Sequence, residues 1–227
     1  MSRQHAMFGR GIEQTDESVR PLRADARRNL ERILVAAREA FLEQGFTVPL
    51  DEIARRGGVG IATLYRRFPD RQTLARAVAL DVWARSGQEA RQALDEEPSA
   101  VAALARYLHR ALDLGIGAVM PLLMGHSPLD DEAQRARDQS AMLVQRVVAA
   151  AQAEGSLRPD VTSGDMGLLL VRLSRPLPGS FPHALDRAIA HRQLDLLLAG
   201  LRADAAPVRP LTGPALTLDD LRTLAPE

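Results

Sequence analysis

The stretch from Gly57 to Phe68, Gly-Gly-Val-Gly-Ile-Ala-Thr-Leu-Tyr-Arg-Arg-Phe, combines close glycines with a helix-like apolar run and two adjacent arginines. Glycines that open a helix can cradle the phosphates of a nucleotide. The same residues can instead form a tight turn between two short helices, the second of which enters DNA. The two chemistries differ in what has to precede the glycines.

A nucleotide-binding loop follows a β-strand, and the segment Leu50–Arg56 before these glycines has helical rather than alternating spacing. Gly58 and Gly60 supply two of the three glycines of the dinucleotide fingerprint, but Thr63 stands at the third. A phosphate-loop NTPase also needs a lysine, and all 29 basic residues of the chain are arginines. Both nucleotide-binding interpretations are therefore set aside.

Two short helices joined by a glycine-containing turn form a helix-turn-helix. The apolar residues that would pack its helices are Ile53, Ala54, Val59, Leu64 and Phe68. The outer face of the second helix would then carry Gly60, Ile61, Ala62, Thr63, Tyr65, Arg66 and Arg67. Seven helical residues span about 10 Å, which fits a major groove about 12 Å wide. The same geometry also occurs in ordinary helical cores, so the motif alone leaves that alternative open.

Helical periodicity also dominates the rest of the chain, and no segment alternates with period two, so we expect an all-α protein. The spacing of apolar residues and of Gly, Pro and capping residues predicts these helices: from Asp25 to Gly45, Leu50–Arg56, Ile61–Phe68, Arg71 to about Ser86, Asp131–Glu154, Asp165–Arg175 and Ala184–Ala203. A further apolar stripe runs from Val101 to Leu112, and Pro121 is expected to interrupt the chain after it.

The predicted organisation has four parts. Residues 1–22 are expected to be a disordered arm, 23–70 a three-helix helix-turn-helix domain, 71–203 a helical ligand-binding and dimerisation domain, and 204–227 a disordered tail. From Arg20 to Trp83 there are 12 arginines against 8 acidic residues, although the whole chain has no net charge. A basic N-terminal third favours an anionic partner at that end.

Several classes of protein are disfavoured by composition. The absence of cysteine removes disulfides, thiolate nucleophiles and cysteine-based metal sites. No apolar run is long enough to span a membrane, and residues 1–19 lack the apolar core of a signal peptide. We therefore expect a cytoplasmic protein without a membrane partner and without a cofactor.

The stretch Arg27–Leu74 resembles the DNA-binding domain of the TetR family of bacterial transcriptional regulators, without gaps. The residues that carry this resemblance are Ile33-Leu34, Ala36-Ala37, Phe41, Gly45-Phe46, Ile53-Ala54, Gly58-Val59, Thr63-Leu64-Tyr65, Phe68-Pro69 and Leu74. The resemblance implies a homodimer that binds double-stranded operator DNA, in most members a repressor released by a small molecule. It implies no enzymatic activity.

Carried over by motif position, Thr63, Tyr65 and Arg67 are expected to contact the DNA backbone or bases. Variable reading positions would be Gly60, Ile61, Ala62 and Arg66. Arg71 stands where the family has a basic residue that shares a phosphate with a helix N-terminus, and Arg27 and Arg28 would lie near neighbouring phosphates or the minor groove. Pro49 replaces the hydroxyl residue that usually caps the second helix.

An effector site is expected inside the helical bundle, lined by Trp83, Arg106, Tyr107, His109, Met120, Leu123, Met124 and His126. Most of these side chains could equally be core. The last two long helices are expected to pair with their copies in a second subunit through Leu169, Leu194, Leu197, Leu198 and Leu201. Such a dimer would place its recognition helices about 34–36 Å apart on a palindromic operator.

Two other function classes are weighed against regulation. Gly125-His126-Ser127-Pro128-Leu129 begins like the Gly-x-Ser-x-Gly elbow of hydrolases but lacks the last glycine and the preceding strand. The five histidines are scattered without a paired spacing beside carboxylates, which disfavours a metal site. A small hydrolase using Ser127 or a helical scaffold for protein partners remain the alternatives.

Overall fold

The computed structural model describes residues 19–124, 129–175, 177, 182–203, 211–212 and 214–215. These residues form nine helices and no strand, apart from one isolated bridge between Leu157 and Arg202. The helices are α1 (Val19–Gln44), α2 (Leu50–Arg56), α3 (Ile61–Arg67), α4 (Arg71–Glu96), α5 (Ala100–Asp113), α6 (Ile116–Met124), α7 (Asp131–Ala153), α8 (Ser163–Leu173) and α9 (His183–Leu201). The predicted all-α class is confirmed.

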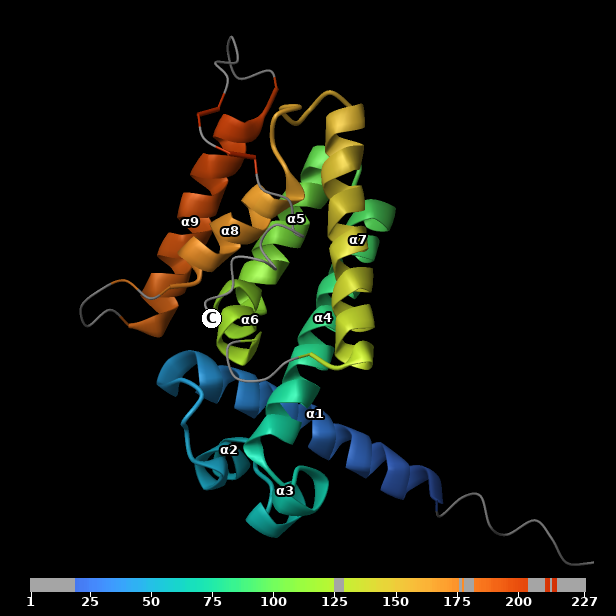
Figure 1. Ribbon diagram of the computed structural model, residues 1–227, viewed down its shortest axis with the longest axis vertical. Coiled ribbons are helices and arrows are strands. Elements are labelled where there is room, and N and C mark those ends of the chain that lie inside the picture. The colour runs from blue at the N-terminus through green and yellow to red at the C-terminus, as the bar shows by residue number, and fades with distance from the viewer. Residues whose placement is uncertain are drawn as a thin grey trace, which may run out of the picture.

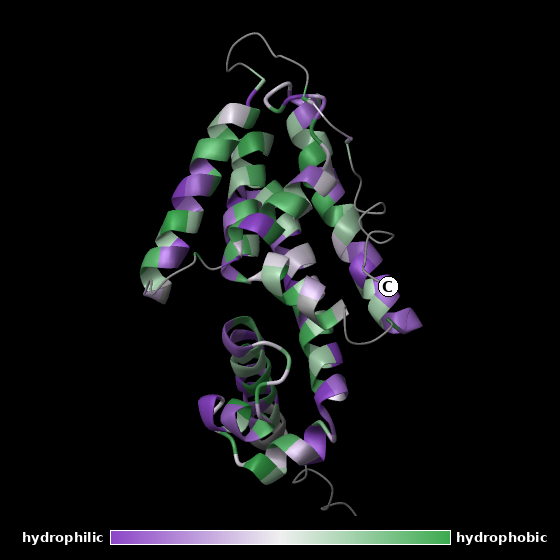
Figure 2. Cartoon of the chain, turned by 60° about the vertical axis from the view of Figure 1, so that its left-hand side comes forward, coloured by the Kyte–Doolittle hydropathy of each residue, from purple (hydrophilic) through white to green (hydrophobic). Residues whose placement is uncertain are grey.

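Helices α1–α3 gather at one end of the molecule, and α4 rises from them to join the larger bundle of α5–α9 (Figure 1). The apolar faces of the helices turn toward one another in both parts (Figure 2). One buried cluster joins α1, α2 and α3 to the first half of α4 and to α6. A second cluster joins the end of α4 to α5, α7, α8 and α9. Helix α4 therefore contributes to both cores and connects them.

Capping residues explain where most helices begin. Asp70, Ser99 and Asp130 each accept a hydrogen bond from a main-chain N–H in the first turn of α4, α5 and α7. Thr162 and Asp165 form a reciprocal capping box at the start of α8. The predicted bounds of α2 are confirmed, and those of α3, α7, α8 and α9 differ by one or two residues.

Three sequence-based expectations about helix bounds are wrong. Helix α1 begins at Val19, inside the predicted arm 1–22, because Pro21 falls in its first turn, where the missing N–H costs no hydrogen bond. Helix α4 continues ten residues beyond Ser86. Pro121 lies within α6 rather than ending it. The rest of the arm, residues 1–18, lies outside the described residues, as does most of the predicted tail.

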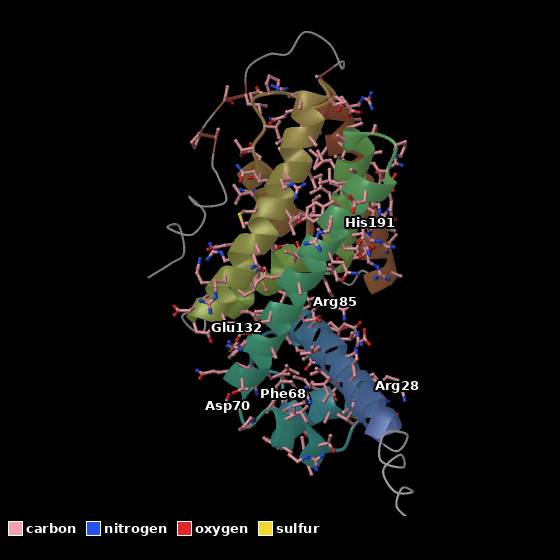
Figure 3. The ribbon with its side chains drawn as sticks, turned by 90° about the vertical axis from the view of Figure 1, so that its right-hand side faces the viewer. Arg28, Phe68, Asp70, Arg85, Glu132 and His191 are labelled. Carbon is pink, nitrogen blue, oxygen red and sulfur yellow. The ribbon has the colours of Figure 1, made fainter. Side chains whose placement is uncertain are left out.

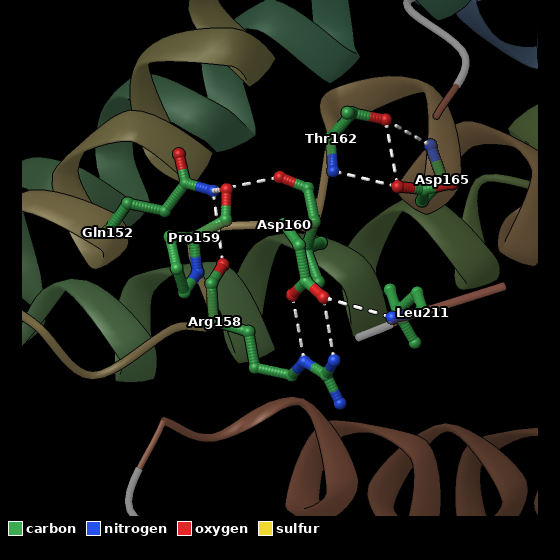
Figure 4. A network of polar contacts seen from close by, with 8 residues as sticks. Gln152, Arg158, Pro159, Asp160, Thr162, Asp165 and Leu211 are labelled. Carbon is green, nitrogen blue, oxygen red and sulfur yellow. Dashed lines mark hydrogen bonds and ion pairs between the residues drawn. The ribbon is translucent and has the colours of Figure 1, made fainter. Parts of the chain in front are cut away.

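The connection between α7 and α8 is held by a network of polar contacts (Figure 4). The Gln152 amide nitrogen donates to the main-chain oxygens of Arg158, Pro159 and Val161, at 3.1, 3.3 and 2.8 Å. Arg158 forms a two-point ion pair with Asp160, at 2.9 and 2.7 Å, and this pairing lowers the pKa of Asp160 to about 2. The network therefore links the end of α7 to the connection that leads into α8. Among the described residues no helix has the length and apolar character needed to cross a membrane.

Candidate nucleic-acid interface

The turn between α2 and α3 is set by Gly58, whose φ of +59° lies in the left-handed region. The Gly58 N–H donates to the Arg55 oxygen at 3.2 Å, and the Val59 N–H donates to the Ala54 oxygen at 3.0 Å. This pair of bonds is a Schellman motif, which ends a helix and reverses the chain direction. The prediction that Gly58 makes the turn is confirmed. Pro49 precedes α2 without any side-chain cap, as expected.

Helix α3 is anchored by one apolar edge and exposes the remainder. Leu64 is fully buried and Phe68 nearly so, both within the core shared with α1 and α2. Thr63 is half-buried, and the other six predicted outer residues are exposed: Gly60, Ile61, Ala62, Tyr65, Arg66 and Arg67. Ile61 and Tyr65 keep 41% and 50% of their surface in solvent. Exposed large apolar and aromatic side chains beside arginines are typical of a surface that contacts a partner.

The arginines of this domain fall into two groups. Arg56 of α2 donates to Glu43 of α1 at 2.6 Å and to Glu52 at 2.8 Å, and Arg55 pairs with Glu52 at 2.8 Å. Hydrogen bonds from Arg55 and Arg56 lower the pKa of Glu52 to about 2. By contrast, Arg66 and Arg67 form no ion pair within the described part of the chain. Among the arginines of α2 and α3, the guanidinium groups that form no ion pair with described residues are therefore those of Arg66 and Arg67.

Arg71 is engaged in contacts within the fold. Its Nη1 donates to the main-chain oxygen of Phe46 at 2.6 Å and also to that of Val48, and the guanidinium lies over the Phe46 ring. These bonds tie the start of α4 to the loop between α1 and α2. Asp70 already caps α4 with a carboxylate, which disfavours a phosphate at that helix end. Arg71 therefore has a structural contact that the sequence did not predict, and its contact with a phosphate stays a prediction.

Arg27 and Arg28 lie on the exposed N-terminal part of α1. Arg28 pairs with Asp25, whereas Arg27 forms no ion pair with any described residue. Figure 3 shows Arg28 and Asp70 on opposite sides of this part of the molecule. Near Arg28, an open cleft of about 580 Å³ separates α1 from the end of α2, and acidic and basic side chains line it together. That mixture gives the cleft no preference for an anion.

The predicted effector residues are divided between the two buried clusters and the surface. Trp83, Met120 and Leu123 are buried in the cluster that contains α1, whereas Tyr107 is buried in the other cluster. Arg106 lies nearer the surface and pairs with Glu96 and Glu97, at 2.8 and 3.1 Å.

His109 bonds to His191 and Asp195 instead of turning inward. The Met124 side chain and His126 lie outside the described residues, as do Ser127 and the rest of the hydrolase-like sequence apart from Leu129.

One buried polar pair stands out in the larger domain. The hydroxyl groups of Ser86 on α4 and Tyr107 on α5 are 3.1 Å apart, and both residues are buried. Burial raises the pKa of Tyr107 to about 12, so the phenol is neutral near neutral pH. Ser86 was not among the predicted site residues, because nothing in the local sequence marks a serine within a helix as buried.

The predicted dimer residues divide according to exposure. Leu194 has no exposed surface and packs in the second core, so its assignment to a subunit interface is wrong. Leu169, Leu198 and Leu201 are partly buried against the same core. Leu197 is 41% exposed, and its neighbour Leu196 is 65% exposed. The exposed large apolar side chains of α9 are therefore the adjacent pair Leu196 and Leu197 and, nearer its start, Leu185, which is 48% exposed.

The comparisons with known proteins agree with this geometry. The family model described as bacterial regulatory proteins, tetR family, matches residues 33–78, and that of the transcriptional regulator SbtR-like C-terminal domain matches residues 97–203. No curated protein matches the chain.

Solved structures similar to the chain come from several bacteria. A TetR transcriptional regulator from Streptomyces coelicolor is 32% identical, with 78% of this chain and 99% of that one covered and a TM-score of 0.59. A TetR transcription regulatory protein from Mycobacterium vanbaalenii is 34% identical, covering 80% and 99%, with a TM-score of 0.58. The TetR-like regulator LfrR from Mycobacterium smegmatis, in complex with proflavine, is 24% identical, covers 81% and 99%, and has a TM-score of 0.57.

Proposed function

Because this chain belongs to the TetR family of bacterial regulatory proteins, we propose that it is a repressor released from its operator by a small molecule. Membership makes it a DNA-binding transcriptional regulator and not an enzyme. Beyond family membership, the proposal states that the protein represses transcription, which residues contact DNA, that it forms a dimer and that a small molecule releases it. The observation that carries it is the surface of α3.

Helix α3 offers the groove-facing side chains of this proposal. Tyr65 is half-exposed, and Arg66 and Arg67 are exposed beside it, without an ion pair among the described residues. Arginine can reach phosphate oxygens or the O6 and N7 atoms of guanine. Ile61 and Ala62 present only apolar surface, which suits contact with thymine methyl groups. Contacts of Thr63, Tyr65 and Arg67 with the DNA backbone would set the position of α3 along the duplex, and Arg66 would contact the bases.

Dimerisation would bury the exposed leucines of α9. Leu196 and Leu197 are adjacent in the chain and thus occupy neighbouring edges of the helix, while Leu194 on the inner side holds α9 to the protomer. A two-fold axis beside α9 would pair this surface with itself. Leu196→Asp would place a charge in that contact and convert the dimer to a monomer in light scattering coupled to gel filtration. An unchanged mass would remove Leu196 from the proposed interface.

The effector is proposed to enter between α4 and α5, near the Ser86–Tyr107 pair. This pair supplies hydroxyl groups in an otherwise apolar interior, the composition that small-molecule sites require. Trp83 lies one turn before Ser86 on α4. LfrR, which has a similar fold, was crystallised with proflavine, and this supports a small-molecule effector for the present chain. A ligand that binds better to a dimer with wrongly spaced recognition helices would lower operator affinity by linkage.

Fluorescence anisotropy with labelled DNA from the region upstream of the gene tests the proposal. We expect saturable binding with a stoichiometry of one dimer per palindrome, weakening steeply as salt rises. Transcription of a reporter behind the same DNA should fall when the protein is present. A rise in transcription would contradict repression. Absence of binding to any neighbouring DNA at low salt would contradict the α3 interface and favour a scaffold for protein partners.

A further inference from the structure

His109 of α5 and His191 of α9 meet at the surface between these two helices. Their Nδ1 atoms are 2.7 Å apart. The Nε2 of His109 lies 2.9 Å from Asp195 of α9, and the Nε2 of His191 lies 3.0 Å from Asp113 of α5. Both rings are about three-quarters buried, and Figure 3 shows His191 beside α5. Each helix thus contributes one imidazole and one carboxylate to a four-residue chain of hydrogen bonds.

The two imidazoles meet edge to edge. Their planes are within 12° of parallel and their centroids are 5.0 Å apart. Stacked faces would keep all atoms of one ring at least about 3.5 Å from the other. The two Nδ1 atoms are 2.7 Å apart, which is shorter than the separation of stacked faces. The rings therefore meet at their Nδ1 edges, and the in-plane direction of each Nδ1 atom points toward the other. A contact this short between ring nitrogens requires a proton on one of them.

Counting protons defines the charge of this pair. Ionised aspartates only accept hydrogen bonds, so each Nε2 has to carry a proton to donate to Asp113 or Asp195. The bond between the Nδ1 atoms needs one proton, not two. Three protons on four ring nitrogens give one neutral and one cationic imidazole. The three bonds are therefore complete in a single protonation state.

We propose that the His109–His191 pair is a pH-sensitive tie that holds α9 against α5 most firmly when the pair carries one positive charge. A second positive charge at low pH places two N–H groups head to head at the Nδ1 contact. Loss of the charge at high pH leaves two protons for three bonds, so that either the two Nδ1 lone pairs face each other or one Nε2 lone pair faces a carboxylate. The tie therefore weakens on both sides of an intermediate pH. Its effect on DNA would follow through α9 and rests on the proposed dimer.

No other charged side chain among the described residues bonds to the four residues of the tie, His109, His191, Asp113 and Asp195. Neither Asp113 nor Asp195 forms an ion pair with an arginine in the described ranges. Arg110 on α5 is turned to Glu89, 4.0 Å away, and Arg106 pairs with Glu96 and Glu97. Helix α6 carries no charged residue. Further charged groups near these helices are exposed or bonded elsewhere, among them Glu154 at the end of α7, Asp165 and Arg172 on α8, and Asp186, Arg187 and Arg192 on α9.

Hydrogen exchange of the full-length protein between about pH 5 and 9 tests the tie, since histidine changes charge in this range. After correction for intrinsic exchange, protection of the amides of α9 should peak at intermediate pH and fall about five- to tenfold toward either end, the loss expected for one hydrogen bond. His191→Gln should flatten this profile. The matched control His183→Gln, at the first residue of α9, should keep it.

Histidine labelled with ¹⁵N provides a second readout that needs no variant. We expect one cationic ring and one ring with an unprotonated Nδ1 at the pH of greatest protection. Equal profiles for the native protein and His191→Gln, or two neutral rings throughout, would overturn the proposal. If added Zn²⁺ protects the amides of α9 from exchange more strongly than any pH does without it, the proposal is overturned in favour of a metal site. Because no readout uses DNA, these outcomes are independent of whether the protein is a repressor.

Discussion

Arg71, the first residue of α4, donates from Nη1 to the main-chain oxygen of Phe46, 2.6 Å away, in the loop that joins α1 to α2. The same nitrogen also donates to the oxygen of Val48. The Arg71 guanidinium therefore connects the start of the long helix α4 with the loop between α1 and α2.

Replacing Arg71 by alanine should destabilise the protein, because two partly buried carbonyl oxygens would lose a charged donor. We expect a loss of about 1–3 kcal/mol, seen as a lower melting temperature without DNA. Arg67→Ala is the matched control and should leave the melting temperature unchanged, since Arg67 makes no described contact. An unchanged melting temperature for Arg71→Ala would mean that the arginine serves DNA rather than the fold.

Gly58→Ala should destabilise the turn between α2 and α3. A residue with a side chain in the left-handed region costs about 1–2 kcal/mol, and Gly58 has a φ of +59°. Chemical denaturation gives the difference in free energy of unfolding. Gly200→Ala, in α9 with open space around its Cα, is the control and should be neutral or stabilising. Equal effects of the two substitutions would contradict the backbone conformation at Gly58.

Gly117→Ala should separate α6 from α8. A Cβ at Gly117 would lie 2.3 Å from the main-chain oxygen of Leu170, which cannot rotate away as a side chain could. Overpacking of this kind costs about 1–3 kcal/mol or more. The melting temperature should fall by several degrees, with Gly200→Ala again as the reference. A variant as stable as the native protein would show that α6 and α8 are not in backbone contact.

Tyr107 should make the protein sensitive to alkali. Its pKa is about 12 in the fold and 10.0 in an unfolded chain, so the folded state holds the proton more tightly. The resulting stability is complete below pH 10 and is lost as pH rises toward 12, by about 3 kcal/mol. Tyr107→Phe should remove this part of the pH dependence and should cost about 1 kcal/mol at neutral pH, because Ser86 loses its partner. Identical alkaline profiles would contradict the burial of Tyr107.

Local signals allowed the helix-turn-helix to be predicted almost residue by residue. Pro49, Gly57 and Gly58 mark the limits of α2 through backbone geometry alone, and Asp70 marks the start of α4 through its cap. Apolar spacing identified the buried side of α3 and left its outer residues exposed. These features depend on neighbours within a few positions, where sequence patterns are informative.

Features that depend on distant contacts were missed or misassigned. Gly87 looks like a helix end, but it lies inside α4 where Leu143 of α7 packs closely, so the helix continues. His109 and His191 are 82 positions apart, and no local spacing relates them. Leu194 and Leu196 are both leucines of one apolar run, and only the packing of α9 decides which one is buried.

The measurement that tests the DNA-binding surface most directly is the salt dependence of operator binding by Arg67→Ala and Arg55→Ala. Arg67 is exposed without an ion pair among the described residues, whereas Arg55 is exposed but paired with Glu52. Arg67→Ala should reduce the slope of log affinity against log salt by about 1 for each subunit of the dimer, and Arg55→Ala should leave it unchanged. An unchanged slope for Arg67→Ala would contradict the assignment of α3 as the DNA-contacting helix.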